Sequence, residues 1–230
     1  MEGHRIFETQ DGSRSLFSER FGVSYHSRYG AWQETQHVFI EAGLRYQAID
    51  QTEMSVLDIG FGTGLNCIAS LLFAFQQNIK LQYVGLEAYP VPTETLKALD
   101  YPSLLEWDSG QVDLYDRMHA IEWNGETQAI QTSKEAVSLE VTKRKEKFEQ
   151  LTDTDQFDVI YYDAFAPEAQ PELWTIEMFE RMHKALKPGG VLVTYCAKGQ
   201  VKRDMKAAGF TIERLKGPPG KREMTRASKA

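Results

Sequence analysis

Hydrophobic positions along the chain alternate between short apolar runs and segments with a helical period. From residue 54 onward the runs are rich in β-branched and aromatic residues, and between them apolar positions recur every three to four residues. The pattern predicts strands at 54–59, 81–86, 157–162 and 191–196 and helices at 64–75, 92–99, 175–186 and 200–208. Strands that alternate with helices form a mostly parallel, twisted sheet with helices on both faces. The sequence therefore predicts an α/β fold.

The two ends of the chain depart from this alternation. Residues 1–50 begin with polar, turn-rich sequence and then predict a helix over 32–46. We expect 1–50 to form an N-terminal extension or lid, and 51–230 to form the main domain. Near the C-terminus, residues 210–215 and 222–227 flank a Gly-Pro-Pro-Gly turn and predict an antiparallel hairpin.

The middle of the chain has a weaker pattern. Residues 112–123 and 137–141 are apolar enough to predict strands, and the lysine-rich stretch 143–151 predicts a charged helix with an exposed face.

Composition narrows the class of protein. With 230 residues and 42% hydrophobic content, the chain can bury one sizeable core. No apolar run reaches the length of a membrane span, and the first residues lack the order of a signal peptide, so we expect a cytoplasmic protein without membrane contact. Cys67 and Cys196 lie within predicted apolar elements, and His26 and His37 have no companions at metal-ligand spacing. We therefore expect no metal site.

The net charge of −7 hides an asymmetry. The stretch 198–230 holds ten basic and three acidic residues, so the rest of the chain is more acidic than the total suggests. A basic edge on an acidic body is typical of a protein that contacts phosphates at one place. On charge alone, a solvated helix and strand explain it equally well.

A glycine-rich turn joins the predicted strand 54–59 to the helix that follows it. The sequence Asp-Ile-Gly-Phe-Gly-Thr-Gly over 58–64 places glycines where a nucleotide-like ligand could approach the backbone. A dinucleotide-binding turn would require a third glycine three residues after Gly62, where this chain has Leu65. The turn therefore disfavours a nicotinamide oxidoreductase.

Two acidic residues follow predicted strands. Glu87 directly follows the strand 81–86, 23 residues after Gly64. A carboxylate about 20 residues after such a glycine turn can accept hydrogen bonds from ribose hydroxyls. The alternative is a surface acid that caps the strand. Asp163 follows the strand 157–162, so we expect its side chain at the same edge of the sheet. The loop 163–167 resembles the Asp/Asn-Pro-Pro-aromatic loop of amino methyltransferases, which implies that Asp163 holds an attacking amine by accepting its N–H, with Phe165 stacked on a flat ring. The alternatives are a helix N-cap for Asp163 and a core position for Phe165.

Several blocks of sequence together resemble one family. They are residues 18–22 (Ser-Glu-Arg-Phe-Gly), 25–27 (Tyr-His-Ser), 58–66, 163–167 (Asp-Ala-Phe-Ala-Pro), 171–174 (Pro-Glu-Leu-Trp) and 217–224 (Gly-Pro-Pro-Gly-Lys-Arg-Glu-Met). Over nearly the whole chain they resemble the MnmC-like methyltransferases, whose stand-alone form is MnmD.

This resemblance implies a Rossmann-like fold that uses S-adenosylmethionine. It further implies methyl transfer to the primary amine of 5-aminomethyl-2-thiouridine at the tRNA wobble position, giving 5-methylaminomethyl-2-thiouridine. Bifunctional members of the family add an FAD-dependent oxidase domain, which we expect to be absent from this chain. The alternatives are a methyltransferase of a small amine or a protein, and a non-catalytic Rossmann-like binding module.

The resemblance also implies roles for particular residues. It assigns the cofactor to Asp58, Gly60, Gly62, Gly64, Asn66 and Glu87. It makes Asp163 the catalytic residue and assigns substrate binding to Phe165, Pro167, Tyr25, His26, Lys221 and Arg222, with Lys198, Lys202 and Arg203 as further candidates for phosphate contact. Many methyltransferases have an acidic residue that contacts the adenine amine, but 141–145 contains none, which leaves the adenine contacts open.

Overall fold

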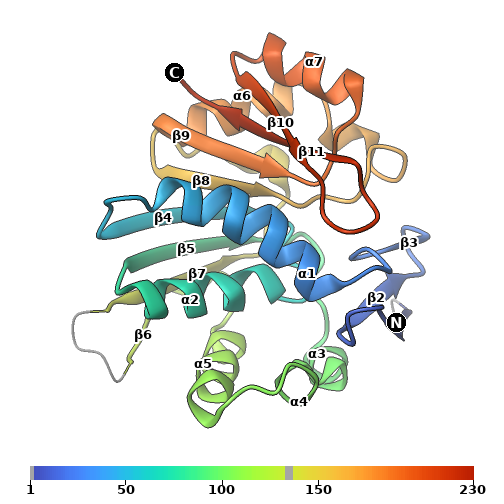
Figure 1. Ribbon diagram of the computed structural model, residues 1–230, viewed down its shortest axis with the longest axis vertical. Helices are drawn as coiled ribbons and strands as arrows, with labels where there is room; N and C mark the ends of the chain where they lie inside the picture. Colours follow the sequence, from blue (N-terminus) through green and yellow to red (C-terminus); the bar gives the residue numbers. More distant parts are fainter. Residues whose placement is uncertain (1–2, 133–136) are drawn as a thin grey trace.

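A twisted sheet of eight strands forms the centre of the molecule, in the computed structural model that describes residues 3–132 and 137–230 (Figure 1). The strands, in their order across the sheet, are β10 (Thr211–Lys216), β11 (Glu223–Ser228), β9 (Leu186–Thr194), β8 (Phe157–Tyr162), β4 (Glu53–Ile59), β5 (Lys80–Leu86), β7 (Leu139–Arg144) and β6 (Gln128–Ile130). The pairs that β4, β5, β7, β8 and β9 form with one another are parallel. β11 is antiparallel to β9 and β10, and β6 is antiparallel to β7. The expected parallel α/β sheet with an antiparallel C-terminal hairpin is confirmed.

Helices cover both faces of this sheet because its strands are apolar on both sides. In β8, Val159 and Tyr161 pack into one core, and Ile160 and Tyr162 pack into the other. The first core is covered by α1 (Ala31–Thr35), its continuation as the π-helix η1 (Gln36–Arg45), α2 (Leu65–Gln77) and α5 (Ser109–Ala120). The second core is covered by α6 (Ile176–Ala185) and α7 (Gly199–Ala207). Two further short helices are α3 (Thr93–Leu99) and α4 (Tyr101–Leu104).

The N-terminal segment consists of two parts. A small antiparallel sheet, drawn on the right in Figure 1, contains β1 (His4–Glu8), β2 (Arg14–Ser18) and β3 (Val23–Ser24). The helix expected over 32–46 is present as α1 and η1, and it buries Val38, Phe39 and Leu44 in the first core. The division of the chain at residue 50 stays a prediction, and Met1 and Glu2 lie outside the described residues.

One expected strand is a helix instead. The apolar content of 112–123 predicts a strand, but most of these residues belong to α5. Asp108 begins this helix with a capping box, in which its carboxylate accepts from the Gln111 N–H at 2.9 Å and its own N–H donates to Gln111 Oε1 at 2.9 Å. Leu114 and Met118, one helical turn apart, are both buried, which is a helical and not an alternating pattern.

The charged helix expected over 143–151 is also wrong. β7 begins at Leu139 and continues through Lys143 and Arg144, and only a short 3-10 helix, η2 (Phe148–Gln150), follows. The two cations are not on an exposed face. The Lys143 ammonium is buried and donates to the His119 carbonyl at 3.1 Å. The Arg144 guanidinium donates to both carboxylate oxygens of Asp153, at 2.7 and 3.1 Å. These tertiary contacts favour the extended strand over local helix propensity.

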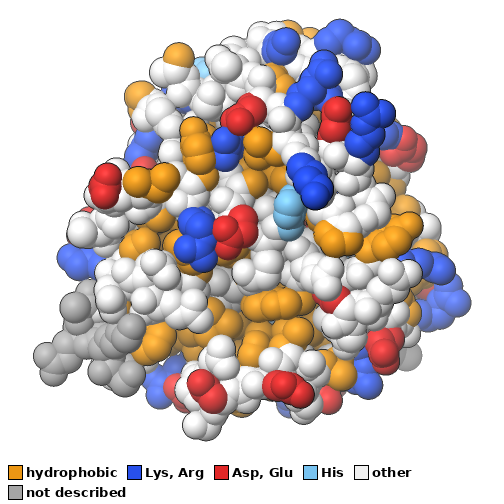
Figure 2. All heavy atoms as spheres, viewed as in Figure 1, with side chains coloured by type: hydrophobic (Ala, Val, Ile, Leu, Met, Phe, Trp, Pro, Cys, Tyr) orange, Lys and Arg blue, Asp and Glu red, His pale blue; other side chains and the backbone are white. Residues whose placement is uncertain are grey.

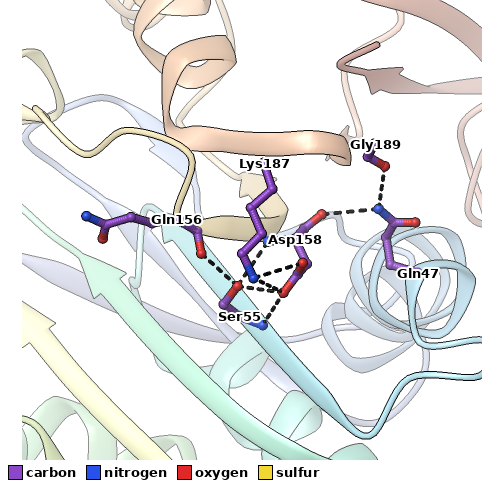
Figure 3. A network of polar contacts seen from close by, with 6 residues as sticks. All are labelled: Gln47, Ser55, Gln156, Asp158, Lys187 and Gly189. Carbon is purple, nitrogen blue, oxygen red and sulfur yellow. Dashed lines mark hydrogen bonds and ion pairs between the residues drawn. The ribbon is translucent and has the colours of Figure 1, made fainter.

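A polar network fastens the amino ends of the strands (Figure 3). The Asp158 carboxylate accepts from the Ser55 N–H at 2.8 Å and from the Ser55 hydroxyl at 2.6 Å, which ties β8 to β4. Lys187 donates to both of its oxygens, at 3.0 and 2.9 Å. The Gln47 amide, which follows η1, donates to the Gly189 carbonyl at 2.7 Å. The network therefore fixes the register of the central strands and the end of the N-terminal helix.

Two further expectations concern single features. Cys67 and Cys196, which the sequence places within apolar elements, are both buried and free. Within the residues that the structure describes, none of the helices combines the length and apolarity that crossing a membrane requires.

Candidate functional site

The glycine turn after β4 lies at the carboxyl edge of the sheet. Gly60, Gly62 and Gly64 all have positive φ angles, of 101°, 51° and 77°. The backbone N–H groups of Gly60 and Phe61 both donate to the Leu86 carbonyl, at 3.1 and 2.9 Å, so the turn is fixed to the end of β5. A Cβ atom on Gly60 would lie 2.7 Å from the Asp163 carbonyl oxygen. Gly60 is therefore required for the turn to pass close to the loop after β8.

A cavity opens between this turn and the loops that follow β5 and β8. It encloses about 940 Å³ of space without protein atoms, a volume that includes open solvent at its mouth. Of the predicted cofactor residues, Gly60, Gly62, Asn66 and Glu87 line it. Asp163, Phe165, Tyr25 and His26 of the predicted catalytic and substrate residues also line it. The structure thus brings together residues that are widely separated in sequence.

Two predicted cofactor residues do not line this cavity. Asp58 is fully buried beneath the turn, where its carboxylate accepts from the Tyr83 hydroxyl at 2.6 Å, and burial raises its pKa to about 7. Gly64 lies at the start of α2, and a Cβ there would lie 3.0 to 3.1 Å from atoms of His119, Met118 and Phe61. Both residues support the turn from the interior of the protein.

Glu87 places its carboxylate in the cavity wall. Its Oε2 accepts from the Gly62 N–H at 3.0 Å, and its Oε1 accepts from the Tyr89 N–H at 2.9 Å. These bonds fix the side chain beside the glycine turn, and a carboxylate oxygen can accept more than one hydrogen bond. The geometry is compatible with the expected binding of ribose hydroxyls.

Asp163 follows β8, and its position is determined by backbone and side-chain bonds. Its N–H donates to the Ile59 carbonyl at 2.9 Å, and its Oδ2 accepts from Asn66 Nδ2 at 2.9 Å. Burial raises its pKa well above the usual value, and the charges of Asp58 and Glu34 raise it further, against the opposing effects of Asn66 and Lys221. A carboxylate with a raised pKa is a better proton acceptor than an exposed one.

Aromatic side chains surround Phe165. Its ring lies 5.0 Å from the Tyr25 ring in an edge-on arrangement and 5.1 Å from the Phe21 ring. Trp174 Nε1 donates to the Phe165 carbonyl at 2.8 Å, which holds this loop against the 3-10 helix η3 (Pro171–Leu173). Phe21 and Tyr89 also line the first cavity, but neither is among the predicted site residues. Phe21 belongs to the block at 18–22 that carries the family resemblance.

A second cavity adjoins the first and shares Tyr25, His26, Asp163 and Phe165 with it. Its wall adds Glu34, Tyr195 and Lys221. Lys221 forms an ion pair with the buried Glu34 carboxylate and lies 3.8 Å from the centre of the Tyr195 ring. The Lys221 ammonium is therefore paired with Glu34, and its role as a phosphate contact stays a prediction.

His26 contributes to this wall as a neutral imidazole. Burial lowers its pKa to about 4, and its Nδ1 lies 2.9 Å from the Ser15 hydroxyl.

An open groove next to the second cavity contains the remaining predicted substrate residues. It is lined by Pro167, Arg222 and Lys198, together with Tyr195 and Lys221. Figure 2 shows Lys and Arg side chains gathered on the upper part of one face, over the C-terminal part of the chain. Lys202 and Arg203 do not line the groove. Lys202 pairs with Glu223 at 3.2 Å, and Arg203 donates to Gln200 at 2.7 Å.

The stretch after β7 forms another part of the first cavity. Lys147, Phe148 and Glu149 line it, with Phe148 buried. Sequence reasoning misses this wall, because the charge pattern of the stretch predicts an exposed helical face. The sequence 141–145 contains no acidic residue that could contact an adenine amine. Glu149 places a carboxylate in this wall of the cavity. In the described part of the chain, no group of three or more His, Cys, Asp and Glu side chains could hold a metal ion.

The chain is similar to proteins of one methyltransferase family. Residues 112–230 match the model of a family described as S-adenosyl-L-methionine-dependent methyltransferase. The chain is 32% identical over 219 residues to the tRNA 5-methylaminomethyl-2-thiouridine biosynthesis bifunctional protein MnmC of Pseudomonas fluorescens, covering 91% of this chain and 32% of that one. It is 28% identical over 228 residues to the protein of that name from Nitrosospira multiformis, covering 95% of this chain and 36% of that one. The chain therefore spans about a third of the length of these relatives.

Among solved structures, the fold matches the crystal structure of MNMC2 from Aquifex aeolicus. The TM-score is 0.73 with 23% sequence identity, and the match covers 100% of this chain and 71% of that chain.

Proposed function

Because this chain belongs to the S-adenosyl-L-methionine-dependent methyltransferase family, we propose that it methylates the primary amine of 5-aminomethyl-2-thiouridine at the tRNA wobble position. The product is 5-methylaminomethyl-2-thiouridine. The names of the relatives support this substrate, since both are assigned to the biosynthesis of that nucleoside in tRNA. The observation that carries the proposal is a raised-pKa carboxylate, Asp163, in a wall common to two adjoining cavities. A cytoplasmic location agrees with a tRNA substrate.

The first cavity fits the cofactor. Its wall at Gly60 and Gly62 carries no side chain, so a ligand can approach the backbone there, and the Glu87 carboxylate stands beside it. Glu87 would accept the ribose hydroxyls, and Phe148 and Glu149 would lie along the remaining ligand surface. When bound, the cofactor supplies an electrophilic methyl group on a sulfonium.

The second cavity fits the acceptor. Asp163 would accept an N–H of the amine, so that the nitrogen lone pair remains available for attack. Formation of the new N–C bond would break the bond between the methyl group and the sulfonium sulfur, so that S-adenosylhomocysteine would leave as a neutral thioether. The same carboxylate would take the proton that the nitrogen releases. Its raised pKa suits the second role, because it makes the ionised carboxylate a better acceptor for the proton that the nitrogen releases.

The surrounding residues would bind the base and the RNA. Phe165, with Tyr25 packed edge-on against it, provides a flat apolar surface for a pyrimidine ring. Arg222 and Lys198 line the open groove beside the cavity, where Arg222 would contact the phosphates next to the wobble nucleotide. Lys198 forms an ion pair with Glu168 and would have to exchange that partner for a phosphate. Pro167 would shape the entrance between the groove and the acceptor cavity.

The experiment that tests this proposal uses tRNA bearing 5-aminomethyl-2-thiouridine, the purified protein and S-adenosylmethionine labelled in its methyl group. Nucleoside mass spectrometry should detect labelled 5-methylaminomethyl-2-thiouridine. tRNA with an unmodified wobble uridine is the control and should take up no label. Methylation of a small amine or of protein without RNA would identify a different substrate, and failure to bind S-adenosylmethionine would indicate a non-catalytic binding module.

A further inference from the structure

A chain of hydrogen bonds connects the N-terminal helix to Asp163. The Thr35 hydroxyl donates to Asn66 Oδ1 at 2.9 Å, and Asn66 Nδ2 donates to Asp163 Oδ2 at 2.9 Å. Thr35 is fully buried at the end of α1, and Asn66 is buried in the first turn of α2. Three separate elements therefore meet at the carboxylate to which we assign catalysis.

The direction of these bonds determines how the Asn66 amide faces. If the amide were turned over, its oxygen would lie against Asp163 Oδ2, and two acceptors would face each other across 2.9 Å. That arrangement is unfavourable while Asp163 is ionised. The hydrogen bond from Thr35 occupies the amide oxygen and keeps the NH₂ side turned toward the carboxylate.

These hydrogen bonds use only one of the two carboxylate oxygens of Asp163, so the other can accept a hydrogen bond from a ligand. Oδ2 is taken by Asn66, and within residues 3–132 and 137–230 no side chain donates a hydrogen bond to Oδ1. Asp163 lies in the wall common to the two cavities, which makes Oδ1 the oxygen available to an amine bound there.

We propose that Thr35 and Asn66 are positioning residues, which hold the Asp163 carboxylate so that Oδ1 faces the acceptor amine. This inference rests on the proposed function, because it requires Asp163 to accept the N–H of the amine. It also assigns to Asn66 a role different from the cofactor contact that the sequence suggested. Thr35 lines neither cavity, so its effect on the reaction is transmitted through Asn66.

The test compares Thr35→Val with Thr35→Ser. Valine keeps the shape of threonine but cannot donate, whereas serine keeps the hydroxyl. The matched control is Thr225→Val, because the Thr225 side chain is also fully buried and donates to a carbonyl, that of Cys196, at 2.7 Å. For each variant, steady-state kinetics on aminomethyl-bearing tRNA, S-adenosylmethionine affinity by calorimetry and a pH–rate profile are measured.

We expect Thr35→Val to lower kcat by roughly ten-fold to a hundred-fold, since small misplacements of a reacting group have effects of this size. KM for tRNA and the affinity for the cofactor should change less than about two-fold. The acid limb of the pH–rate profile should move to higher pH, because the bond from Asn66 lowers the pKa of Asp163 and would be weakened. Thr35→Ser and Thr225→Val should retain wild-type kcat.

Other results would overturn the inference. An unchanged kcat in Thr35→Val, or an equal loss in Thr225→Val, would mean that the hydroxyl has no specific role in positioning. If Thr35→Val lowered the affinity for S-adenosylmethionine as much as kcat, Asn66 would be a cofactor-binding residue and not a positioning residue. If the wild-type protein methylates no aminomethyl-bearing tRNA, the proposed function fails first, and the inference falls with it.

Discussion

Strand β8 has an aspartate near its start and another just after its end. The two carboxylates, at opposite edges of the sheet, differ in their hydrogen-bond and charge partners. Asp158, near the start of the strand, accepts hydrogen bonds from Ser55 and forms an ion pair with Lys187 at 2.9 Å. Asp163, just after the strand, accepts from Asn66 and has two other acidic groups, Asp58 and Glu34, close enough to raise its pKa. Both line clefts that contain charged residues.

The difference shows why a charged cleft is not by itself a binding site. At the amino edge, Ser55, Asp158, Lys187 and Gln47 satisfy one another, so a ligand would have to break existing bonds (Figure 3). At the carboxyl edge, the glycine turn leaves its backbone without side chains. Asp163 is buried there, and its hydrogen bond from Asn66 and the charge of Lys221 do not offset the effects that raise its pKa. Unused hydrogen-bonding capacity next to open backbone favours ligand binding there.

Replacing each aspartate should separate the two roles. Asp163→Ala should lower kcat on aminomethyl-bearing tRNA by about a thousand-fold or more, because both orientation and proton acceptance are lost. Its melting temperature should stay constant or rise, since a buried carboxylate with a raised pKa is destabilising when ionised. S-adenosylmethionine affinity, measured by calorimetry, should be retained.

Asp158→Ala is the reciprocal variant. It leaves the Ser55 N–H and the Lys187 ammonium without this acceptor, and should lower the free energy of unfolding by about 1–3 kcal/mol. At temperatures well below melting, its kcat should match the wild type. A catalytic loss in Asp158→Ala comparable to that of Asp163→Ala would abolish the distinction between the two edges.

Two glycines with positive φ angles allow the comparison to be sharpened. Gly60 has φ of 101°, and a Cβ there would lie 2.7 Å from the Asp163 carbonyl oxygen. Gly189, in the amino-edge network, has φ of 79° but open space around its Cβ position. We expect Gly60→Ala to weaken S-adenosylmethionine binding by about ten-fold or more, because the turn and the Asp163 loop must separate. Gly189→Ala should cost only about 1 kcal/mol of stability.

Calorimetric titration and thermal unfolding of the two glycine variants measure these effects. Equal losses of cofactor affinity would show that backbone strain anywhere in the sheet is sufficient, and that the close approach at Gly60 has no special importance.

The sequence predicts best what depends on strand ends. The runs before Asp58, Glu87 and Asp163 are short and strongly apolar, so their boundaries are visible in the sequence. Carboxyl ends of parallel strands share one edge, and for that reason the amino-acid sequence alone predicts that the glycine turn, Glu87 and Asp163 converge.

What depends on contacts between distant segments could not be predicted in this way. Glu34 and Lys221 form an ion pair although they lie near opposite ends of the chain, and no local pattern indicates such a pair. Lys143 stands in a run of charges typical of an exposed helix, but tertiary packing buries it at the end of β7. The distinction between Gly60, which lines the cavity, and Gly64, which supports the turn, depends on neighbours contributed by the Asp163 loop and by α5.

The smallest expected effect concerns the acid limb of the pH–rate profile. Activity requires ionised Asp163, so it falls as the pH decreases through the pKa of that group, which lies above the usual value for an aspartate. Glu34→Gln removes a charge that raises this pKa and frees Lys221, which lowers it, so the limb should move to lower pH. The rate on the limb should rise a few-fold while the plateau is retained.

Lys221→Met is the opposing variant and should move the limb to higher pH, because the cation that favours ionised Asp163 is lost. Lys187→Met, at the amino edge, removes a cation that does not act on Asp163 and should leave the limb in place. kcat/KM measured across the acid range compares all three. If Lys187→Met moves the limb as far as Lys221→Met, the profile reports the net charge of the protein, and the local electrostatic account of the carboxyl edge is wrong.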